Sequence, residues 1–288
     1  DLEAFYSVQG EGRWVGVPSL FLRVFGCNFE CAGFGQERGK LIPVEEMPYQ
    51  IDERADPEHE LAYKSIEELP VTPIGCDSSA SWSRKYKHLQ MTKTPEEVFE
   101  HLVSLIPNGT FEGRHGEDIH LVITGGEPLL GWQRVWPSLL SMCKEVGLKN
   151  VTFETNTTQT LHEDFFNYLN KHERIAVTWS CSPKLSVSGE PWETAIKPDV
   201  AFEYQLVNNS NIYLKFVVAT QNDFDEVTRA VQAYRDADID CPVYLMPLGG
   251  RSEEYNLNVK EVAEACMERG WRFTPRLHIS LFGNAWGT

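Results

Sequence analysis

The chain has 288 residues, enough for one large domain or two ordinary ones, and its 42% hydrophobic and 24% charged residues are typical of a soluble globular protein. Asp and Glu outnumber Lys and Arg by 42 to 26, so the net charge of −16 argues against direct nucleic acid binding through a broad basic surface. No apolar stretch approaches the roughly 18–20 residues of a membrane-spanning helix, which argues against a membrane protein.

The N-terminal residues and the cysteines bear on the cellular compartment. Asp1-Leu2-Glu3 lacks the positive start and the apolar run of a secretory signal, so we expect a cytoplasmic, reducing location. Seven cysteines, an odd number, are then expected to be ligands or buried thiols and not disulfides.

A first strand is expected at residues 18–25, which are apolar almost throughout and end abruptly in Gly26-Cys27-Asn28. From residue 32 to about 93 the sequence shows little periodicity and is far longer than an ordinary connection, so we interpret it as an insertion. Thr94-Pro95-Glu96-Glu97 has the pattern of an N-cap, a first-turn proline and a capping-box glutamate, which predicts a helix to about Leu105.

The rest of the chain alternates strands and helices. Strands are expected at 119–124, 151–154, 175–181, 213–219, 242–246 and 271–275, with helices near 132–145, 162–171 and 259–269 and another opened by Asp223, with Glu226 three residues on. This alternation predicts an α/β fold with a mostly parallel sheet, open or curled into an incomplete barrel. Ligands of such sheets bind beyond the carboxyl ends of the strands. No change in composition requires a domain boundary.

Cysteines follow the first expected strand. Cys27 and Cys31 are separated by three residues, and 44 residues separate Cys31 from Cys76. Two cysteines at this spacing are more often small core residues. Gly26 and Asn28 nevertheless indicate a loop, where thiols at the carboxyl end of a strand can become ligands.

Polar motifs follow the next three expected strands: Thr124-Gly125-Gly126-Glu127-Pro128, Glu154-Thr155-Asn156 and Ser182-Pro183-Lys184. Paired glycines let the backbone approach a ligand closely, and a carboxylate can accept hydrogen bonds from an ammonium group. Each motif alone is also typical of a turn or a helix cap. The remaining cysteines are expected to be buried apolar residues: Cys143, Cys181, Cys241 and Cys266.

Taken in this order, the cysteines and the polar motifs resemble the radical S-adenosylmethionine (SAM) enzymes. Within that superfamily, residues 5–12 (FYSVQGEG) and 21–28 (FLRVFGCN) are specifically similar to the 7-carboxy-7-deazaguanine synthase family, as are Cys76-Asp77-Ser78 and the region of His278. The similarity covers the chain from end to end except residues 32 to about 74.

The resemblance implies a single radical SAM domain over residues 1–288, built as a partial parallel (β/α)6-type barrel with the insertion, about 32–75, inside the cluster-binding loop. A [4Fe-4S] cluster would be held by Cys27, Cys31 and Cys76, and Mg2+ by the hydroxyl of Ser78, where the family has a threonine. The residues implied for SAM are Gly75, Gly126, Glu127, Glu154, Asn156, Ser182, Pro183, Lys184, Met246, Pro247 and Leu248. Those implied for the substrate are Val8, Gln9, Gly10, Glu11, Arg23, Thr124, His278 and Thr288.

The implied reaction converts 6-carboxy-5,6,7,8-tetrahydropterin to 7-carboxy-7-deazaguanine, in 7-deazaguanine (queuosine-type) biosynthesis. Reductive cleavage of SAM gives a 5′-deoxyadenosyl radical that abstracts hydrogen from the pterin, and ring contraction with loss of ammonia follows. No residue is implied as a general acid or base, because the cofactors carry this chemistry. The resemblance also implies an electron donor such as flavodoxin or ferredoxin, and a homodimer.

The cysteine spacing departs from the superfamily pattern, in which three and then two residues usually separate the ligands. Two other interpretations stay open at this point. One is a different radical SAM enzyme, such as a glycyl-radical activase, against which the set Gln9, Glu11 and Arg23 argues. The other is a non-catalytic, zinc-stabilised interaction protein that uses the three cysteines and His88.

Overall fold

The computed structural model describes residues 3–37, 40–90, 92–171 and 174–288, and shows one eight-stranded sheet whose spatial order follows the sequence. The first pair, β1 and β2, is antiparallel, and all later neighbours are parallel. The strands are β1 (Ala4–Val8), β2 (Pro18–Val24), β3 (His120–Gly125), β4 (Asn150–Thr155), β5 (Ala176–Cys181), β6 (Ser210–Val218), β7 (Val243–Pro247) and β8 (Arg272–Phe273). The order ends at β1 and β8, so the described sheet is a partial barrel, as predicted.

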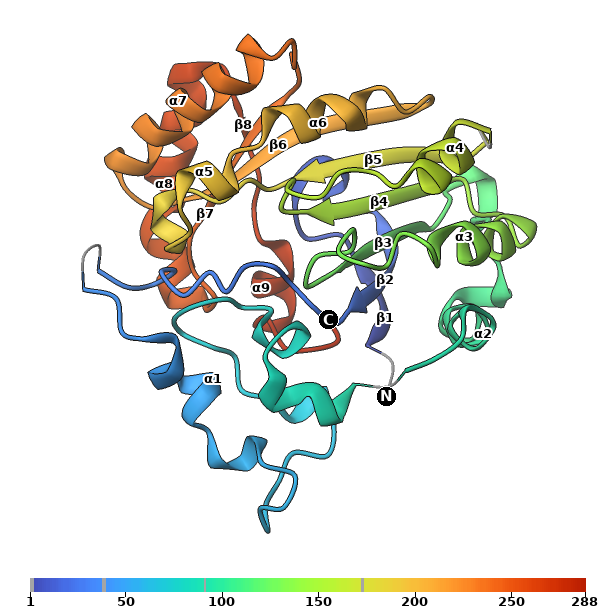
Figure 1. Cartoon of the computed structure of the whole chain (residues 1–288), viewed down its shortest axis with the longest axis horizontal. Coiled ribbons are helices and arrows are strands. Elements are labelled where there is room, and N and C mark those ends of the chain that lie inside the picture. Colours follow the sequence, from blue (N-terminus) through green and yellow to red (C-terminus); the bar gives the residue numbers. More distant parts are fainter. Residues whose placement is uncertain (1–2, 38–39, 91, 172–173) are drawn as a thin grey trace.

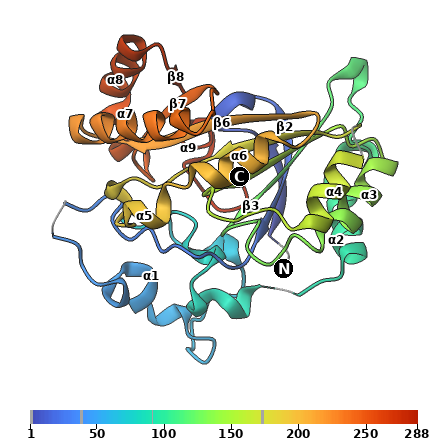
Figure 2. The same cartoon turned by 45° about the horizontal axis from the view of Figure 1, so that its top comes forward.

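Helices lie along the sheet (Figures 1 and 2), with α2, α3 and α4 near one end and α7 and α8 near the other. Their bounds are α2 (Pro95–Leu105), α3 (Trp136–Glu145), α4 (Glu163–Lys171), α5 (Trp192–Ala195), α6 (Pro198–Gln205), α7 (Gln221–Asp236), α8 (Ser252–Arg269) and α9 (Leu277–Phe282). Apolar side chains of these helices and of the strands form one large core, in which Phe153 and Trp179 stack at 5.2 Å and Trp179 and Tyr204 at 4.7 Å.

Two helix starts show where local patterns succeed and where they fail. The capping box of α2 is confirmed, because the Thr94 hydroxyl accepts from the Glu97 N–H and the Glu97 carboxylate accepts from the Thr94 N–H. The predicted start of α7 at Asp223 is wrong. Thr220 is the N-cap, and Asp223 is the residue whose carboxylate accepts from the Thr220 N–H at 2.8 Å. Glu226 instead accepts from the N–H and the hydroxyl of Ser186.

Several elements were not predicted, namely β1, α5, α6 and α9, and α8 begins earlier than expected. Strand β8 is short, with only two residues. Three of the four remaining cysteines are buried as predicted, Cys143, Cys181 and Cys266, whereas Cys241 is half-buried. No helix in the described ranges is both long and apolar enough to cross a membrane. Asp1 and Leu2, on which the N-terminal expectation depends in part, lie outside the described residues.

The insertion contains only short helical segments but has an apolar core of its own. These segments are η2 (Val44–Glu46), α1 (Pro48–Ile51), η3 (Glu53–Ala55), η4 (Ile66–Glu68), η5 (Ser79–Ser81) and η6 (Arg84–Leu89). Its buried residues include Met47, Tyr49 and Tyr86, and Trp286 from near the other end of the chain packs against them. The segment therefore folds over one side of the barrel, where Figure 1 shows α1.

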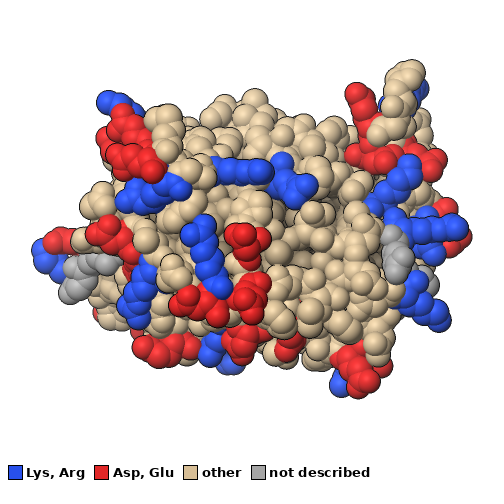
Figure 3. Space-filling model, turned by 90° about the horizontal axis from the view of Figure 1, so that it is seen from above, with Lys and Arg blue, Asp and Glu red and all other residues tan. Residues whose placement is uncertain are grey.

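Acidic and basic side chains are interspersed on the face of the molecule seen in Figure 3, with a largely uncharged area to the right of its centre. A charged residue also lies inside the sheet: Lys215 is the single charged residue of β6, whose sequence is SNIYLKFVV. Lys215 is 4% exposed, so its ammonium group needs a partner inside the protein.

Candidate active site

A pocket of about 500 Å3 lies beyond the carboxyl ends of the parallel strands, and it brings together most of the residues singled out from the sequence. The predicted site residues that line it are Val8, Gln9, Gly10, Glu11, Arg23, Cys27, Cys31, Gly75, Cys76, Ser78, Thr124, Gly126, Glu154, Asn156, Ser182, Lys184, Met246, Leu248, His278 and Thr288. Glu127, Pro183 and Pro247 do not line it. The individual roles of all these residues stay predictions.

The three proposed cluster cysteines lie together. Cys31 packs with Phe29 and Ala195, and Cys27 and Cys76 pack against this group, although 44 residues separate Cys76 from Cys31 in sequence. Burial raises the pKa of the Cys27 thiol to about 12 and also raises those of Cys31 and Cys76. A bound metal would reverse this preference, because coordination deprotonates a thiol. One buried and two half-buried cysteines that line one pocket are a donor set that fits an iron-sulfur cluster.

The first cysteine loop is held in place by Glu190. One oxygen of its carboxylate accepts hydrogen bonds from the N–H groups of Glu30 and Cys31, at 2.9 and 2.8 Å. Cys31 has a φ of 49°, in the left-handed region that non-glycine residues rarely adopt, so this pair of hydrogen bonds holds a backbone conformation that is costly on its own.

His88, the fourth residue of the alternative zinc site, does not join the three cysteines. Within the described ranges, no three His, Cys, Asp or Glu side chains converge closely enough to hold a single metal ion. His88 lies exposed on η6, with its Nδ1 3.0 Å from the carbonyl oxygen of Lys85, and does not line the pocket. The three cysteines can still hold an iron-sulfur cluster, because the ligands of a cluster bind different iron atoms and need not converge on one point.

Glu127 lies behind the pocket wall. It is fully buried, and its carboxylate accepts from the Thr155 hydroxyl at 2.8 Å and from the N–H groups of Asn156 and Leu129 at 2.7 and 3.1 Å. Burial raises its pKa to about 7. The side chain thus connects the loop after β3 to the loop after β4, and the part of the motif that reaches the pocket is Gly125 and Gly126.

Gly126 must be glycine for a steric reason. A Cβ there would lie 2.0 Å from the carbonyl oxygen of Gly26, directly before Cys27. We expect Gly126→Ala to destabilise the protein by roughly 1–3 kcal/mol, measured by urea unfolding, because one backbone segment has to move. The control is Gly131→Ala, whose Cβ meets nothing within 4 Å and only strains a φ of 78°. Parental stability in Gly126→Ala would contradict this expectation.

Gln9, Thr124 and Glu154 form a second polar group. The amide of Gln9 donates to one oxygen of Glu154 at 3.1 Å, and the Thr124 hydroxyl donates to the other at 3.1 Å. The carbonyl of the Gln9 side chain accepts from the Glu11 N–H at 3.1 Å. Residues predicted separately for SAM and for substrate are therefore neighbours here.

Glu11 is the centre of an ion network that was not predicted. Its carboxylate lies 2.6 Å from Nζ of Lys215 and 3.2 Å from Nε of Arg276, and Arg276 also binds the carboxylate of Asp77. Burial alone would raise the pKa of Glu11, but Lys215 and Arg276 hold it well below its usual range. Lys215 could have been noticed as the only charge in β6, whereas no local signal distinguishes Arg276.

Three further predicted residues lie around this network. Nε2 of His278 is 3.9 Å from Glu11, and burial lowers the pKa of the imidazole. The Ser78 hydroxyl donates to Asp77 at 3.3 Å. Nε of Arg23 lies 3.0 Å from Glu3, and its guanidinium sits 5.2 Å from the centre of the Trp286 ring.

No protein-family model matches the chain. It is 30% identical to the 7-carboxy-7-deazaguanine synthase of Halobacterium salinarum, over 98% of this chain and 90% of that protein. The chain belongs to the 7-carboxy-7-deazaguanine synthase family. Another member of the family, from Pyrobaculum aerophilum, is 28% identical over 99% of this chain and 96% of its own length. The crystal structure of QueE from Escherichia coli shares the fold, with a TM-score of 0.54 and 19% identity over 96% of this chain and 92% of that one.

The comparisons confirm the resemblance, the fold class and the enzyme class predicted from the sequence. As a member of the 7-carboxy-7-deazaguanine synthase family, the chain is a radical SAM lyase of 7-deazaguanine biosynthesis.

Proposed function

We propose that this enzyme converts 6-carboxy-5,6,7,8-tetrahydropterin to 7-carboxy-7-deazaguanine and ammonia. Substrate and products contain the same atoms, so the conversion needs no net oxidant or reductant. The observation that supports the proposal is the pocket itself, which Gln9, Glu11 and Arg23 line together with the three cysteines. A glycyl-radical activase has no need of this small-molecule recognition set.

We assign the [4Fe-4S] cluster to Cys27, Cys31 and Cys76, with SAM beside it along Gly125, Gly126 and Lys184. When bound, these two cofactors supply the carbon-centred radical that removes a hydrogen atom from the substrate. The Lys184 ammonium group donates to the Ser182 hydroxyl at 3.3 Å and, among the described residues, forms no ion pair, so it is available to a carboxylate. The chain's own contribution is to orient both molecules and to exclude water.

Substrate recognition follows from the hydrogen-bonding groups. The pterin has a guanine-like edge with N–H donors, and the carboxylate of Glu11 and the amide of Gln9 offer acceptors. Thr124, His278 and Thr288 also line the pocket, and we assign them to the substrate as well. The substrate carboxylate needs a cation, which we assign to Arg23 because its guanidinium can bind both oxygens.

Arg23→Lys keeps the positive charge but loses the planar fork, and the ion pair with Glu3 can still form. We expect the KM for the carboxytetrahydropterin to rise about 10- to 100-fold, corresponding to roughly 1.5–3 kcal/mol, while SAM binding is unchanged. Steady-state kinetics and a SAM titration measure the two effects separately. A variant that uses the pterin as the parent does would exclude Arg23 as the carboxylate partner.

We assign Mg2+ to the Ser78 hydroxyl together with substrate oxygens, since this ion favours oxygen ligands and retains waters. Ser78→Ala should lower activity and its dependence on Mg2+ with the cluster intact, and Ser78→Thr should keep both. Activity measured over a range of Mg2+ concentrations tests this. If Ser78→Ala responds to Mg2+ as the parent does, Ser78 only forms the turn beside Asp77.

The electron donor, the homodimer and the cytoplasmic location are further parts of the proposal. A one-electron carrier such as flavodoxin or ferredoxin fits the need for low-potential electrons, and we propose no direct nucleic acid binding.

The deciding experiment is anaerobic reconstitution with iron and sulfide, followed by mass spectrometry of the product formed from 6-carboxy-5,6,7,8-tetrahydropterin and SAM. We expect 7-carboxy-7-deazaguanine and one ammonia per turnover. A brown, cluster-loaded protein that cleaves SAM but leaves the pterin unchanged would overturn the proposed substrate.

A further inference from the structure

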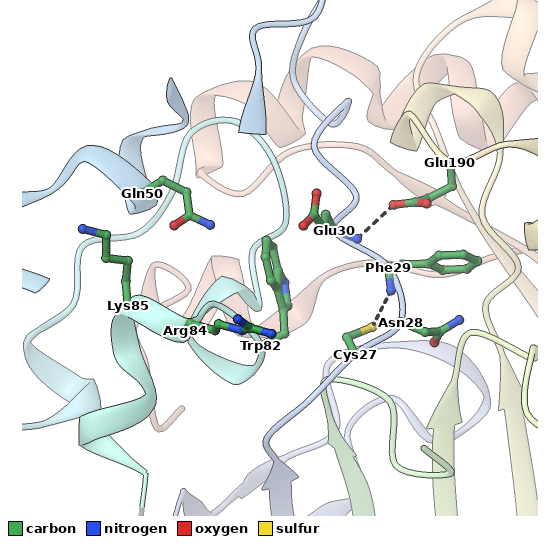
Figure 4. Close-up of a pocket in the computed structure, with 9 residues that line it drawn as sticks. All are labelled: Cys27, Asn28, Phe29, Glu30, Gln50, Trp82, Arg84, Lys85 and Glu190. Atoms are coloured by element: carbon green, nitrogen blue, oxygen red, sulfur yellow. Dashed lines mark hydrogen bonds between the residues drawn. The ribbon is translucent and has the colours of Figure 1, made fainter. Parts of the chain in front are cut away.

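A second cavity, of about 800 Å3, lies on the outer side of the cysteine loop. Cys27, Phe29 and Trp82 line both this outer cavity and the active-site pocket. The Cys27 thiol can therefore be approached from two directions. In Figure 4 the Trp82 indole stands between Arg84 and Lys85 on one wall and Cys27 on the other.

The outer cavity opens beside a group of unpaired cations on η6. Arg84, Lys85 and Lys87 are exposed, and within the residues that the structure describes they form no ion pair. Residues 78–93 contain four Lys and Arg and no Asp or Glu, in a chain whose net charge is −16. We call Arg84, Lys85 and Lys87 the η6 patch. Such a local reversal of sign is a feature that can steer an acidic partner.

The opposite wall carries two carboxylates, Glu30 and Glu190. Glu190 is already engaged, because one of its carboxylate oxygens accepts from two N–H groups of the cysteine loop. Glu30 is exposed and lies on that loop. The cations thus belong to the rim formed by the insertion, whereas Glu30 lies on the cysteine loop and Glu190 is hydrogen-bonded to that loop from the segment after β5.

We propose that the η6 patch is the docking surface for an acidic one-electron carrier protein, which delivers electrons through the outer cavity. This inference rests on the proposed function, since it assumes a cluster at Cys27, Cys31 and Cys76. In each encounter the carrier is oxidised by one electron and the cluster is reduced by one. The arrangement separates two entrances: electrons arrive from the η6 side, and SAM and substrate occupy the pocket.

Trp82 fits the boundary between these entrances. Its ring packs edge-on against Tyr49, with centroids 5.6 Å apart, and its buried Nε1 has no hydrogen-bond partner among the residues that the structure describes. The indole therefore stands between the η6 side and the cysteines, because Trp82 and Cys27 line both cavities. A nucleic acid is the less suitable occupant, because three cations on a strongly acidic protein neutralise too few phosphates for stable binding.

The test reverses the patch charge in the cluster-loaded, full-length enzyme, with Arg84→Glu, Lys85→Glu and Lys87→Glu combined. The matched control makes the same change in charge at three exposed cations elsewhere, Arg114, Arg134 and Lys171. Reduced flavodoxin is the probe, and anaerobic stopped-flow absorbance follows cluster reduction directly. We expect the second-order rate constant of the patch variant to fall by about 10- to 100-fold at low ionic strength, and the control to fall less.

Salt and a small reductant complete the design. The parent's rate with flavodoxin should fall as salt is added, and the patch variant's should depend on salt only weakly. Reduction by dithionite should be equal in all three proteins. Equal flavodoxin rates in the patch variant and the control would overturn the proposal, as would loss of RNA oligonucleotide binding with unchanged flavodoxin rates. If flavodoxin reduces the cluster through the patch but no deazaguanine forms, the proposed substrate fails while the docking surface stands.

Discussion

Cys76→Ala is expected to bind no intact [4Fe-4S] cluster and to lose turnover completely. The three thiols of Cys27, Cys31 and Cys76 pack in one group, and burial keeps all three protonated until a metal binds. Removing one ligand of three leaves two thiolates, too few to hold the cluster with a single open iron. Iron and sulfide content and visible absorbance after anaerobic reconstitution measure the loss, independently of any substrate.

The control for this prediction is Cys241→Ala, which changes a half-buried cysteine outside the pocket. It should bind the parental amount of iron. Cys27→Ala and Cys31→Ala should resemble Cys76→Ala. The assignment of Cys76 fails if Cys76→Ala binds the parental amount of cluster while Cys27→Ala and Cys31→Ala bind none. Another residue would then supply the third ligand, and Cys76 would only pack beside the other two cysteines.

Glu11→Gln is expected to destabilise the protein, without any cofactor, by roughly 3–5 kcal/mol near neutral pH. The substitution keeps the shape of the side chain but leaves Lys215, which is 4% exposed, without its partner at 2.6 Å. Arg276 keeps Asp77, so the effect should lie toward the lower end of that range. Urea unfolding of the unloaded protein measures the difference.

The pH dependence of this difference has a definite sign. The pKa of Glu11 is held well below its ordinary value of 4.5 in the folded protein, so its contribution to stability is present above about pH 4.5. As the pH falls further, the unfolded state takes up a proton that the folded state resists. The stability difference between parent and variant should therefore be constant from about pH 8 to 5 and shrink below it.

Glu264→Gln is the matched control, because Glu264 pairs with Lys260 at 3.7 Å on the surface. It should cost less than about 1 kcal/mol at every pH. A Glu11→Gln protein as stable as this control would mean that water or a neighbouring group compensates Lys215, and the ion network would lose its structural role.

The sequence by itself determined the parallel strands of the sheet and the family, but not the antiparallel strand β1. Strands such as β2 and β3 are buried on both faces, so a continuous apolar run marks them directly, and the α2 capping box lies within four consecutive residues. The sequence also predicted that the motifs at the strand ends lie close together. Parallel strands carry their carboxyl ends to one edge, so motifs that follow successive strands must meet there.

Only the tertiary structure decided which side chains face the pocket and which charges pair. Glu127 follows its strand as predicted, yet its carboxylate turns inward to the backbone of the next loop, a choice of rotamer that no periodicity specifies. Cys76 returns to Cys31 across 44 residues because the insertion has its own core. The contacts of Glu11 with Lys215 and Arg276 join residues more than two hundred positions apart. Local propensity acts over a few residues, whereas these contacts depend on how the whole chain closes around the site.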